Sequence, residues 1–211
     1  MKKQLCLTAD LGGTNTRVAL FDNEKLLENS CVTYSNNEYD SFETIIRNYL
    51  DLVSESSVKF AGIAAAGPIL EKSAKMTNLS WSLTERSIAS ITGAEQVGII
   101  NDLQAQGYGL TSLDQTDLEP ITVGSQCANS NATKLVCGIG TGFNAAPVFN
   151  VGDKIFVPPS EAGHSQLSLT DKSHQPVFAK IGSVGSFVSV EDILSGRGLE
   201  NVGRALTGND E

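Results

Sequence analysis

The sequence lacks several features that would define a function class at once. No apolar run approaches the ~18 residues of a membrane-spanning helix. The four cysteines include no C-x-x-C pair and the chain has two histidines, which argues against a zinc knuckle, a dithiol redox site or a histidine-rich metal cluster. Basic residues are outnumbered 15 to 24 by acidic ones, giving a net charge of -9. We therefore expect no nucleic-acid or membrane partner, because either would need a concentrated basic surface.

The composition is otherwise that of a globular protein. With 211 residues, 40% hydrophobic and 18% charged, the chain is long enough for one large domain or two small ones. The apolar run after Lys3 reaches Asp10 too soon for a secretory signal, which favours a cytoplasmic location. Cys6 and Cys137 lie in apolar, strand-like runs, so we expect buried, reduced thiols there.

One order of elements occurs twice in the chain. The first copy comprises a strand, a glycine turn and two further strands, at residues 4–9, 10–15, 16–21 and 26–33. The second copy repeats this order at residues 133–137, 138–142, 143–149 and 154–157. A repeated supersecondary unit predicts two related subdomains.

Helix and strand patterns alternate between the two copies. Strands are expected at 58–66 and 97–100, and helices at 40–53, 82–90 and from Asn101 toward Gly109. For the first of these helices, Asp40 with Glu43 resembles a capping box. The alternation predicts an α/β fold. Because residues 111–132 are polar and weakly patterned, we place the subdomains at 1–110 and 111–211.

The first glycine turn, Asp10 to Asn15, has the composition of a phosphate-binding loop. Adjacent Gly12 and Gly13 permit positive φ and let backbone N–H groups face an anion. The turn lacks the residues of a dinucleotide-binding or P-loop motif. Taken alone, it is equally compatible with an ordinary hairpin turn headed by an aspartate. The second turn, Gly138 to Gly142, has the same character, and two such turns could hold one polyphosphate.

Six segments, in order, make the sequence resemble the bacterial glucokinase family of the actin, Hsp70 and sugar-kinase superfamily. They are D-x-G-G-T at Asp10–Thr14, T-N-x-x-W at Thr77–Trp81, I-N-D at Ile100–Asp102, G-x-G-T-G at Gly138–Gly142, E-x-G-H at Glu161–His164 and S-x-E-x-x-L-S-G-x-G-L at Ser189–Leu199. The resemblance implies a ribonuclease H-like, actin-like ATPase fold of two subdomains. It also implies ATP-dependent phosphorylation of glucose at the 6-hydroxyl.

The resemblance assigns a role to individual residues. Asp102 matches the catalytic base that accepts the hydroxyl proton. Four residues match the groups that bind the sugar hydroxyls together with Asp102: Asn101, Glu161, His164 and Glu191. The phosphate-facing residues are Asp10, Gly12, Gly13, Thr14, Asn15, Gly140, Thr141 and Gly142. Asp10 further matches the carboxylate that organises Mg²⁺ through water. No zinc is implied, because the cysteine cluster of the related repressor-type sugar kinases is absent.

Several of these residues have a second interpretation. Asp102 could simply cap the helix that follows Ile100, a frequent use of aspartate. Glu191 lies in a capping-box-like pattern formed by Ser189 and Asp192. An isolated histidine such as His164 is more often structural than a sugar ligand, and Trp81 fits a core position. The ordered motifs favour the site roles for Asp102, Glu191 and His164.

The sequence departs from the family pattern in three places. Phe143-Asn144 follows the second turn where the family has leucine and glycine, and we expect Asn144 to tolerate left-handed backbone there. Residues 159–163 replace a more glycine-rich segment. Family members are also longer, so the resemblance predicts an incomplete second subdomain without the adenosine segment.

Three functions therefore remain under comparison. The first is a glucokinase, and the second is a weakly active sugar-binding module that lacks the adenosine pocket. The third, an actin-like ATPase without a sugar substrate, gives no reason for the set Asn101, Asp102, Glu161, His164 and Glu191. The sequence does not fix the oligomeric state, and a homodimer is among those it allows.

Overall fold

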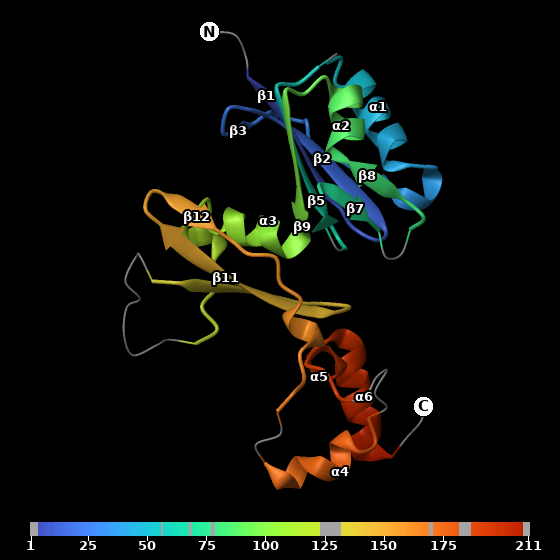
Figure 1. The fold of residues 1–211 in the computed structure, drawn as a ribbon, viewed down its shortest axis with the longest axis vertical. Helices are drawn as coiled ribbons and strands as arrows, with labels where there is room; N and C mark the ends of the chain where they lie inside the picture. Colours follow the sequence, from blue (N-terminus) through green and yellow to red (C-terminus); the bar gives the residue numbers. More distant parts are fainter. Residues whose placement is uncertain are drawn as a thin grey trace. The chain divides into compact units, whose positions relative to one another are not determined.

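The computed structural model describes residues 4–55, 57–67, 69–76, 79–122, 132–168, 171–181 and 187–208. The chain forms two compact units, unit 1 at Met1–Ala105 and unit 2 at Gln106–Glu211 (Figure 1). The division falls within helix α3 (Asp102–Gly109). The predicted assignment of roles to subdomains 1–110 and 111–211 stays a prediction.

Unit 1 is built on one mixed sheet. Its strands are β1 (Leu5–Leu11), β2 (Asn15–Asp22), β3 (Lys25–Leu26), β4 (Val32–Ser35), β5 (Phe60–Ala65) and β9 (Gln96–Asn101). Their order is β3-β2-β1-β5-β9, and β4 pairs with β2. β1 is antiparallel to β2 and parallel to β5, which in turn is parallel to β9. The carboxyl ends of β1, β5 and β9 therefore share one edge of the sheet.

The single strand expected over residues 26–33 is wrong. The structure has β3 and β4 there, separated by a turn in which Asn29 adopts a φ of 59°. The buried Ser30 fixes this turn, since its hydroxyl accepts from the Leu20 N–H at 3.2 Å and donates to the Leu27 carbonyl at 2.8 Å. A side chain that bonds to the backbone in this way competes with continuation of the strand.

Two helices of unit 1 pack against each other, α1 (Phe42–Leu52) and α2 (Glu85–Thr92) (Figure 1). The capping box expected at Asp40 and Glu43 is wrong. Ser41 is the N-cap of α1, and its hydroxyl accepts from the Thr44 N–H at 3.2 Å. The Glu43 carboxylate accepts instead from the Ser87 hydroxyl of α2 at 3.0 Å. It therefore links the two helices.

A small antiparallel sheet adjoins α2, made of β6 (Ile69–Leu70), β7 (Ser73–Lys75) and β8 (Ser82–Thr84). The helix expected at 82–90 accordingly begins three residues later, at Glu85. Trp81 is 9% exposed and belongs to the core of unit 1, as its core interpretation expected. Thr77 and Asn78 of the T-N-x-x-W segment lie outside the described residues.

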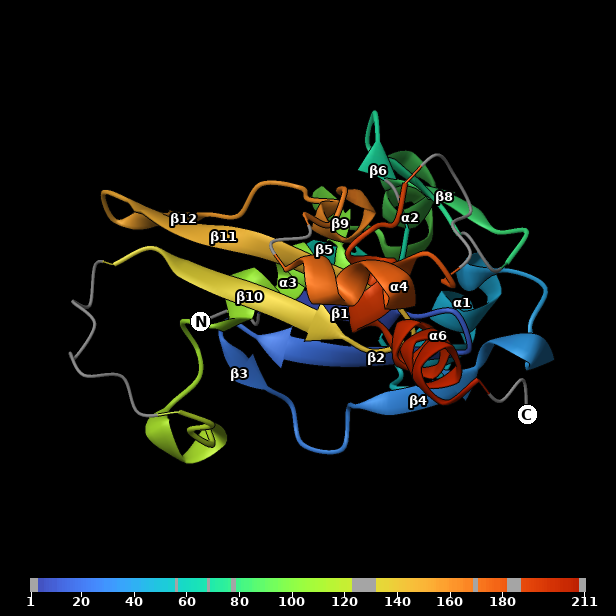
Figure 2. The ribbon, with the colours of Figure 1, turned by 90° about the horizontal axis from the view of Figure 1, so that it is seen from below.

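Unit 2 contains an antiparallel sheet in which β11 (Phe143–Val151) pairs with β10 (Lys134–Ile139) and β12 (Lys154–Phe156) (Figure 2). The second copy of the expected strand order is thus present, although Gly138 and Ile139 belong to β10. Its helices are α4 (Gln175–Phe178), α5 (Glu191–Leu194) and α6 (Gly196–Thr207). Short 3-10 turns occur at η1 (Asn36–Glu38), η2 (Gln115–Asp117), η3 (Ala162–His164) and η4 (Lys172–His174). Across the described residues, every helix is too short or too polar to cross a bilayer.

The cysteines differ from expectation. Cys6 is partly buried on β1, and this burial raises the pKa of its thiol. Cys137, also expected to be buried, is exposed. It lies between Leu135 and Ile139, which point to the same uncovered face of β10 and are 63% and 67% exposed. The apolar sequence predicted strand β10 correctly but did not predict that this face of the strand is exposed.

Candidate functional site

The first glycine turn joins β1 to β2 and is closed by its own backbone. The Gly12 N–H donates to the Asn15 carbonyl at 3.0 Å, and a Cβ on Gly12 would lie 3.1 Å from that oxygen. Gly12 and Gly13 are partly exposed, and Thr14 and Asn15 are exposed. Asp10 is also exposed, and its carboxylate forms no hydrogen bond to another described residue. The turn therefore presents backbone and a free carboxylate to an incoming ligand.

Asn36 holds this turn from outside, a contribution that the sequence interpretation missed. Its side chain is buried at 2% exposure, donates to the Gly12 carbonyl at 2.9 Å and accepts from the Thr16 hydroxyl at 2.7 Å. Its backbone N–H donates to the Thr14 carbonyl at 2.8 Å. No local motif marks Asn36, because its partners lie 20 or more residues away.

The second part of the site in unit 1 is the start of α3. Asn101 ends β9 and is 9% exposed, and its side-chain oxygen accepts from the Leu103 N–H at 2.9 Å. The Asp102 Oδ1 accepts from the same N–H at 2.8 Å. Asn101 therefore occupies the cap position of α3, and the alternative of Asp102 as the cap is wrong because Asp102 is the first residue of the helix. Among the described residues, the Asp102 Oδ2 has no hydrogen-bond partner.

Strand register brings these two parts to the same edge of the sheet. Leu11 pairs with Ala65 across β1 and β5, and Ala65 pairs with Asn101 across β5 and β9. With one strand between them, the first turn and the Asn101-Asp102 pair lie about 10 Å apart along the hydrogen-bonding direction. The carboxyl edge of parallel strands is where open α/β sheets bind ligands.

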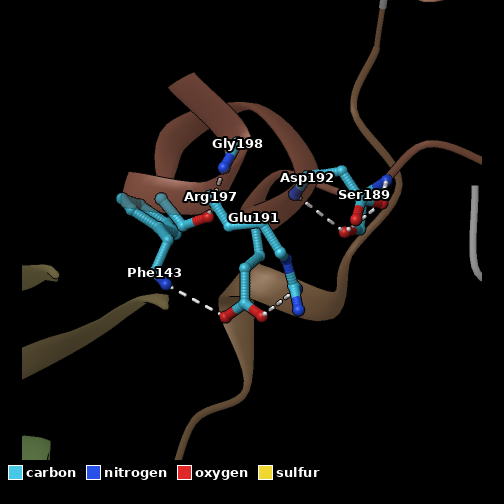
Figure 3. Close-up of polar contacts among 7 residues, drawn as sticks. Phe143, Ser189, Glu191, Asp192, Arg197 and Gly198 are labelled. Atoms are coloured by element: carbon cyan, nitrogen blue, oxygen red, sulfur yellow. Dashed lines mark hydrogen bonds and ion pairs between the residues drawn. The ribbon is translucent and has the colours of Figure 1, made fainter. Parts of the chain in front are cut away.

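In unit 2, the Glu191 carboxylate is held beside the second glycine turn (Figure 3). Its Oε2 accepts from the Phe143 N–H at 3.0 Å, and its Oε1 lies 3.4 Å from Arg197 Nη2 in an ion pair. Arg197 was not singled out from the sequence. The capping-box pattern expected around Glu191 is confirmed, since the Ser189 N–H donates to Asp192 Oδ2 at 2.9 Å and the Asp192 N–H donates to Ser189 Oγ at 3.3 Å. Glu191 is not one of the two partners of this box, and its carboxylate bonds to Phe143 and Arg197 instead.

The second glycine turn contacts the segment that carries Glu191. A Cβ on Gly142 would lie 2.7 Å from the Glu191 Oε2. The Gly140 carbonyl accepts from the Gly196 N–H at 2.7 Å, at the start of α6. Gly140 and Thr141 are exposed. A residue expected to face sugar and a turn expected to face phosphate are therefore neighbours within unit 2.

Glu161 immediately precedes the 3-10 turn η3, and His164 is the last residue of that turn. Both side chains are exposed and form no hydrogen bond to other described residues, while the Glu161 carbonyl accepts from the His164 N–H at 3.1 Å. Between them, Gly163 is buried so tightly that an added Cβ would overlap the Phe143 carbonyl oxygen. The loop thus packs on the same Phe143 backbone that binds Glu191.

Asn144 does not need the tolerance for left-handed backbone that the sequence suggested. Its φ is not positive, because the residue lies within β11 rather than in the turn. Its side chain instead bonds to the loop before η3, donating to the Ser160 carbonyl at 2.6 Å and accepting from the Ala162 N–H at 2.9 Å. Two of the departures from the family pattern, Asn144 and residues 159–163, therefore contact each other through these hydrogen bonds.

Over its described residues, the structure has no cluster of three or more His, Cys, Asp or Glu side chains arranged to hold a metal ion. A Mg²⁺ ion that binds together with a nucleotide needs fewer protein ligands than such a cluster provides, since it keeps several waters and uses one or two carboxylates together with substrate phosphates. Asp10 fits that requirement because its carboxylate is exposed and free of other described partners. It is the residue that could meet such an ion at the first turn.

Comparison with known proteins identifies the class and then the family. A glucokinase from an Antarctic psychrotroph has the same fold, with a TM-score of 0.82 and 29% identity over 97% of this chain and 65% of that chain. A ROK hexokinase from Thermus thermophilus, at 18% identity and a TM-score of 0.64, shares the fold over 97% of this chain and 64% of that one. The fold is thus the ribonuclease H-like, actin-like ATPase fold of sugar kinases.

The glucokinase family profile matches residues 7–211, and the chain belongs to the glucokinase family. The Psychromonas ingrahamii glucokinase is 32% identical over 208 residues, which are 99% of this chain and 64% of that relative. The Tolumonas auensis glucokinase is 32% identical over 97% of this chain and 63% of its own length. The chain thus spans slightly less than two thirds of the curated relatives it matches.

Proposed function

We propose that this chain acts in the ATP-dependent phosphorylation of glucose at its 6-hydroxyl. The observation that carries the proposal is the shared carboxyl edge of β1, β5 and β9, where only β5 lies between the first turn and Asp102. A phosphate held at the turn and a base at the start of α3 suit an in-line transfer from nucleotide to alcohol. Membership of the glucokinase family supports glucose as the acceptor.

In this proposal Asp102 accepts the proton of the 6-hydroxyl as that oxygen attacks the terminal phosphorus of ATP. The new O–P bond forms while the bond to the bridging oxygen breaks, which leaves ADP. The partner-free Asp102 Oδ2 is the atom suited to accept the proton. Asn101 uses its side-chain oxygen on the Leu103 N–H, so its amide nitrogen is the group it offers to sugar.

We assign the remaining sugar contacts to Glu161, His164 and Glu191. The exposed Glu161 carboxylate and His164 imidazole are free to bond with hydroxyls, whereas Glu191 is already oriented by Phe143 and Arg197. A site built to pair each hydroxyl rejects sugars that lack one, because a polar group is then left unpaired. This supports a hexose over smaller alcohols.

The phosphate contacts are assigned to Gly12, Gly13, Thr14 and Asn15 in unit 1 and to Gly140, Thr141 and Gly142 in unit 2. The exposure of Thr14 and Asn15 in the first turn, and of Gly140 and Thr141 in the second, supports this assignment. Mg²⁺ bound with ATP would neutralise charge on the transferred phosphoryl group, and Asp10 would hold it through water. We also propose that the reaction takes place in the cytoplasm.

Calorimetry on this chain tests the proposal directly. Glucose and Mg-ATP are titrated in separate experiments, and glucose 6-phosphate is then assayed with both present. Binding of both ligands with product formation is the expected result. Glucose binding without nucleotide binding would instead identify a sugar-binding module, and nucleotide binding without glucose binding would favour an ATPase that takes no sugar.

A further inference from the structure

Asn144 connects β11 to the loop that carries two of the assigned sugar contacts. Its Nδ2 donates to the Ser160 carbonyl at 2.6 Å, and its Oδ1 accepts from the Ala162 N–H at 2.9 Å. The same oxygen accepts from the Ala145 N–H at 2.9 Å. The residue between the two loop partners is Glu161, so one side chain fixes the backbone on both sides of it.

Further contacts hold the loop in the same place. The Ser160 hydroxyl donates to the Ala145 carbonyl, next to Asn144 on β11. Gly163 packs directly on the Phe143 carbonyl. After His164 the chain is fixed again, since the Ser165 carbonyl accepts from the Val190 N–H at 3.0 Å, adjacent to Glu191.

Glu161 and His164 have no such restraints of their own. Their side chains are exposed and bond to no other described residue, so their position depends on the backbone that carries them. Glu191, in contrast, is oriented through its own carboxylate by the Phe143 N–H and Arg197. Glu161 and His164 are thus held only through their backbone, whereas Glu191 is held through its own side chain.

We propose that Asn144 is a positioning residue of the hexose site, which holds the Ser160–His164 loop so that Glu161 and His164 meet the sugar hydroxyls in fixed geometry. This proposal rests on the proposed function, because it takes the loop to face a sugar. Asn144 itself does not touch the substrate. Its effect is on affinity and on discrimination between hexoses.

The test compares Asn144→Ala with the natural chain. Alanine removes both links to the loop and leaves the Ala162 N–H without its acceptor, so the loop loses its fixed position. We expect glucose affinity, measured by calorimetry, to fall about tenfold or more. We also expect discrimination between glucose and its deoxy and epimeric analogues to narrow, which a general loss of stability would not produce. Exchange of the Ala162 amide, followed by NMR, should become faster.

Asn150→Ala is the matched control, since Asn150 is exposed on the same strand and its side chain bonds to no other described residue. It should leave binding and amide exchange unchanged. Ser160→Ala removes only the hydroxyl link to Ala145 and should shift affinity in the same direction by a smaller factor. This second variant decides the matter should Asn144→Ala fail to fold.

Failure of this proposal differs from failure of the proposed function. If the natural chain binds glucose and Asn144→Ala binds it equally well with equal discrimination, the positioning role is refuted. If the natural chain binds no glucose, the proposed function fails for this chain. Hydrogen exchange of the Ala162 amide is then the measurement that tests whether Asn144 fixes the loop. Faster exchange in Asn144→Ala would then support loop fixation, and unchanged exchange would overturn it.

Discussion

The two units differ in how completely they bury their apolar residues. In unit 1 one continuous cluster runs from β1 to β9, with Leu7, Ile45 and Ile63 at 1% exposure or less. In unit 2 the buried apolar side chains are fewer and smaller, such as Val136, Ala146 and Val148. Several of its large side chains are more than half exposed: Leu135, Ile139, Val151, Phe156, Leu199 and Leu206. Because burial of apolar surface is the main stabilising contribution, unit 1 should be the more stable of the two.

The units also differ in how they hold their parts of the site. In unit 1, strand pairing and the buried Asn36 fix both the turn and the position of Asp102. In unit 2, the Glu191 carboxylate on α5 accepts from the backbone of β11, and the Asn144 side chain connects β11 to the loop before η3. We expect mutations in unit 1 to affect chemistry or folding, and mutations in unit 2 to affect ligand affinity.

The largest predicted effect is on turnover, and it distinguishes the proposed base Asp102 from the proposed sugar contact Glu191. Asp102→Asn removes the proton acceptor and should lower kcat by roughly 10²–10⁴-fold with little change in glucose affinity. Glu191→Gln keeps a carbonyl oxygen for the Phe143 N–H but weakens the ion pair with Arg197, so it should mainly weaken glucose binding. Steady-state kinetics, together with glucose titration, measures both. Near-normal turnover of Asp102→Asn would refute its role as the base.

The next effect concerns stability. Ile63→Ala on β5 opens a cavity in the closed core of unit 1 and should cost about 2–5 kcal/mol. Ile139→Ala on β10 makes the same chemical change at a side chain that is 67% exposed, and should cost no more than about 0.5 kcal/mol. Urea unfolding followed by circular dichroism measures both. Equal losses would contradict the difference between the units.

An alanine in each glycine turn tests whether the first turn is held by its own backbone and the second by contact with the Glu191 side chain. The expected change in the free energy of unfolding or of glucose binding is about 1–3 kcal/mol or less. In Gly12→Ala the added Cβ would lie 3.1 Å from the backbone carbonyl that closes the turn, so stability should fall. In Gly142→Ala it would lie 2.7 Å from the Glu191 carboxylate, which can move away. That variant should lose glucose affinity rather than stability. Thermal unfolding and calorimetry distinguish the two results, and an opposite pattern would argue against the assignment of roles.

The smallest predicted effect is the pH dependence of stability that comes from Tyr49 in unit 1. Burial raises the pKa of Tyr49 from 10.0 to about 12. The Tyr49 hydroxyl donates to the Ser30 carbonyl at 2.7 Å. The unfolded tyrosine ionises first, so this contribution to stability is complete below pH 10 and is lost as the pH rises toward 12. Tyr49→Phe should flatten the alkaline part of the stability curve. Unfolding midpoints at pH 9, 10 and 11 provide the measurement, and an unchanged slope in the variant would show that other groups are responsible.

Local patterns predicted much of the fold because they report short-range physics. Alternating and continuous apolar runs predicted β1, β2, β5 and β9. Both glycine turns occur where they were expected, but they are shorter because the flanking strands extend into them. The strand expected over 26–33 failed because Ser30 bonds to a neighbouring strand. The capping box at Asp40 failed because Ser41 is the better-placed acceptor. In each failure a specific hydrogen bond overrode the local preference.

For the candidate site, the sequence named the residues and the structure supplied their surroundings. The motifs led to Asp102, Glu161, His164 and Glu191, whose roles stay predictions. Asn36 and Arg197 could not be identified, because what they contact depends on strands and helices distant in sequence. Asn144 was noticed only as a departure from the family pattern, and its bonds to the loop before η3 could not be predicted.

The sequence by itself determined the alternation of elements, the two glycine turns and membership of a sugar-kinase family, since these follow from local composition and ordered motifs. Only the tertiary structure decided that Asn36 holds the first glycine turn, that the Asn144 side chain bonds to the backbone of Ser160 and Ala162, and that β10 is uncovered. Hydrogen bonds and burial between distant segments depend on the packed chain. Sequence patterns carry no direct record of them.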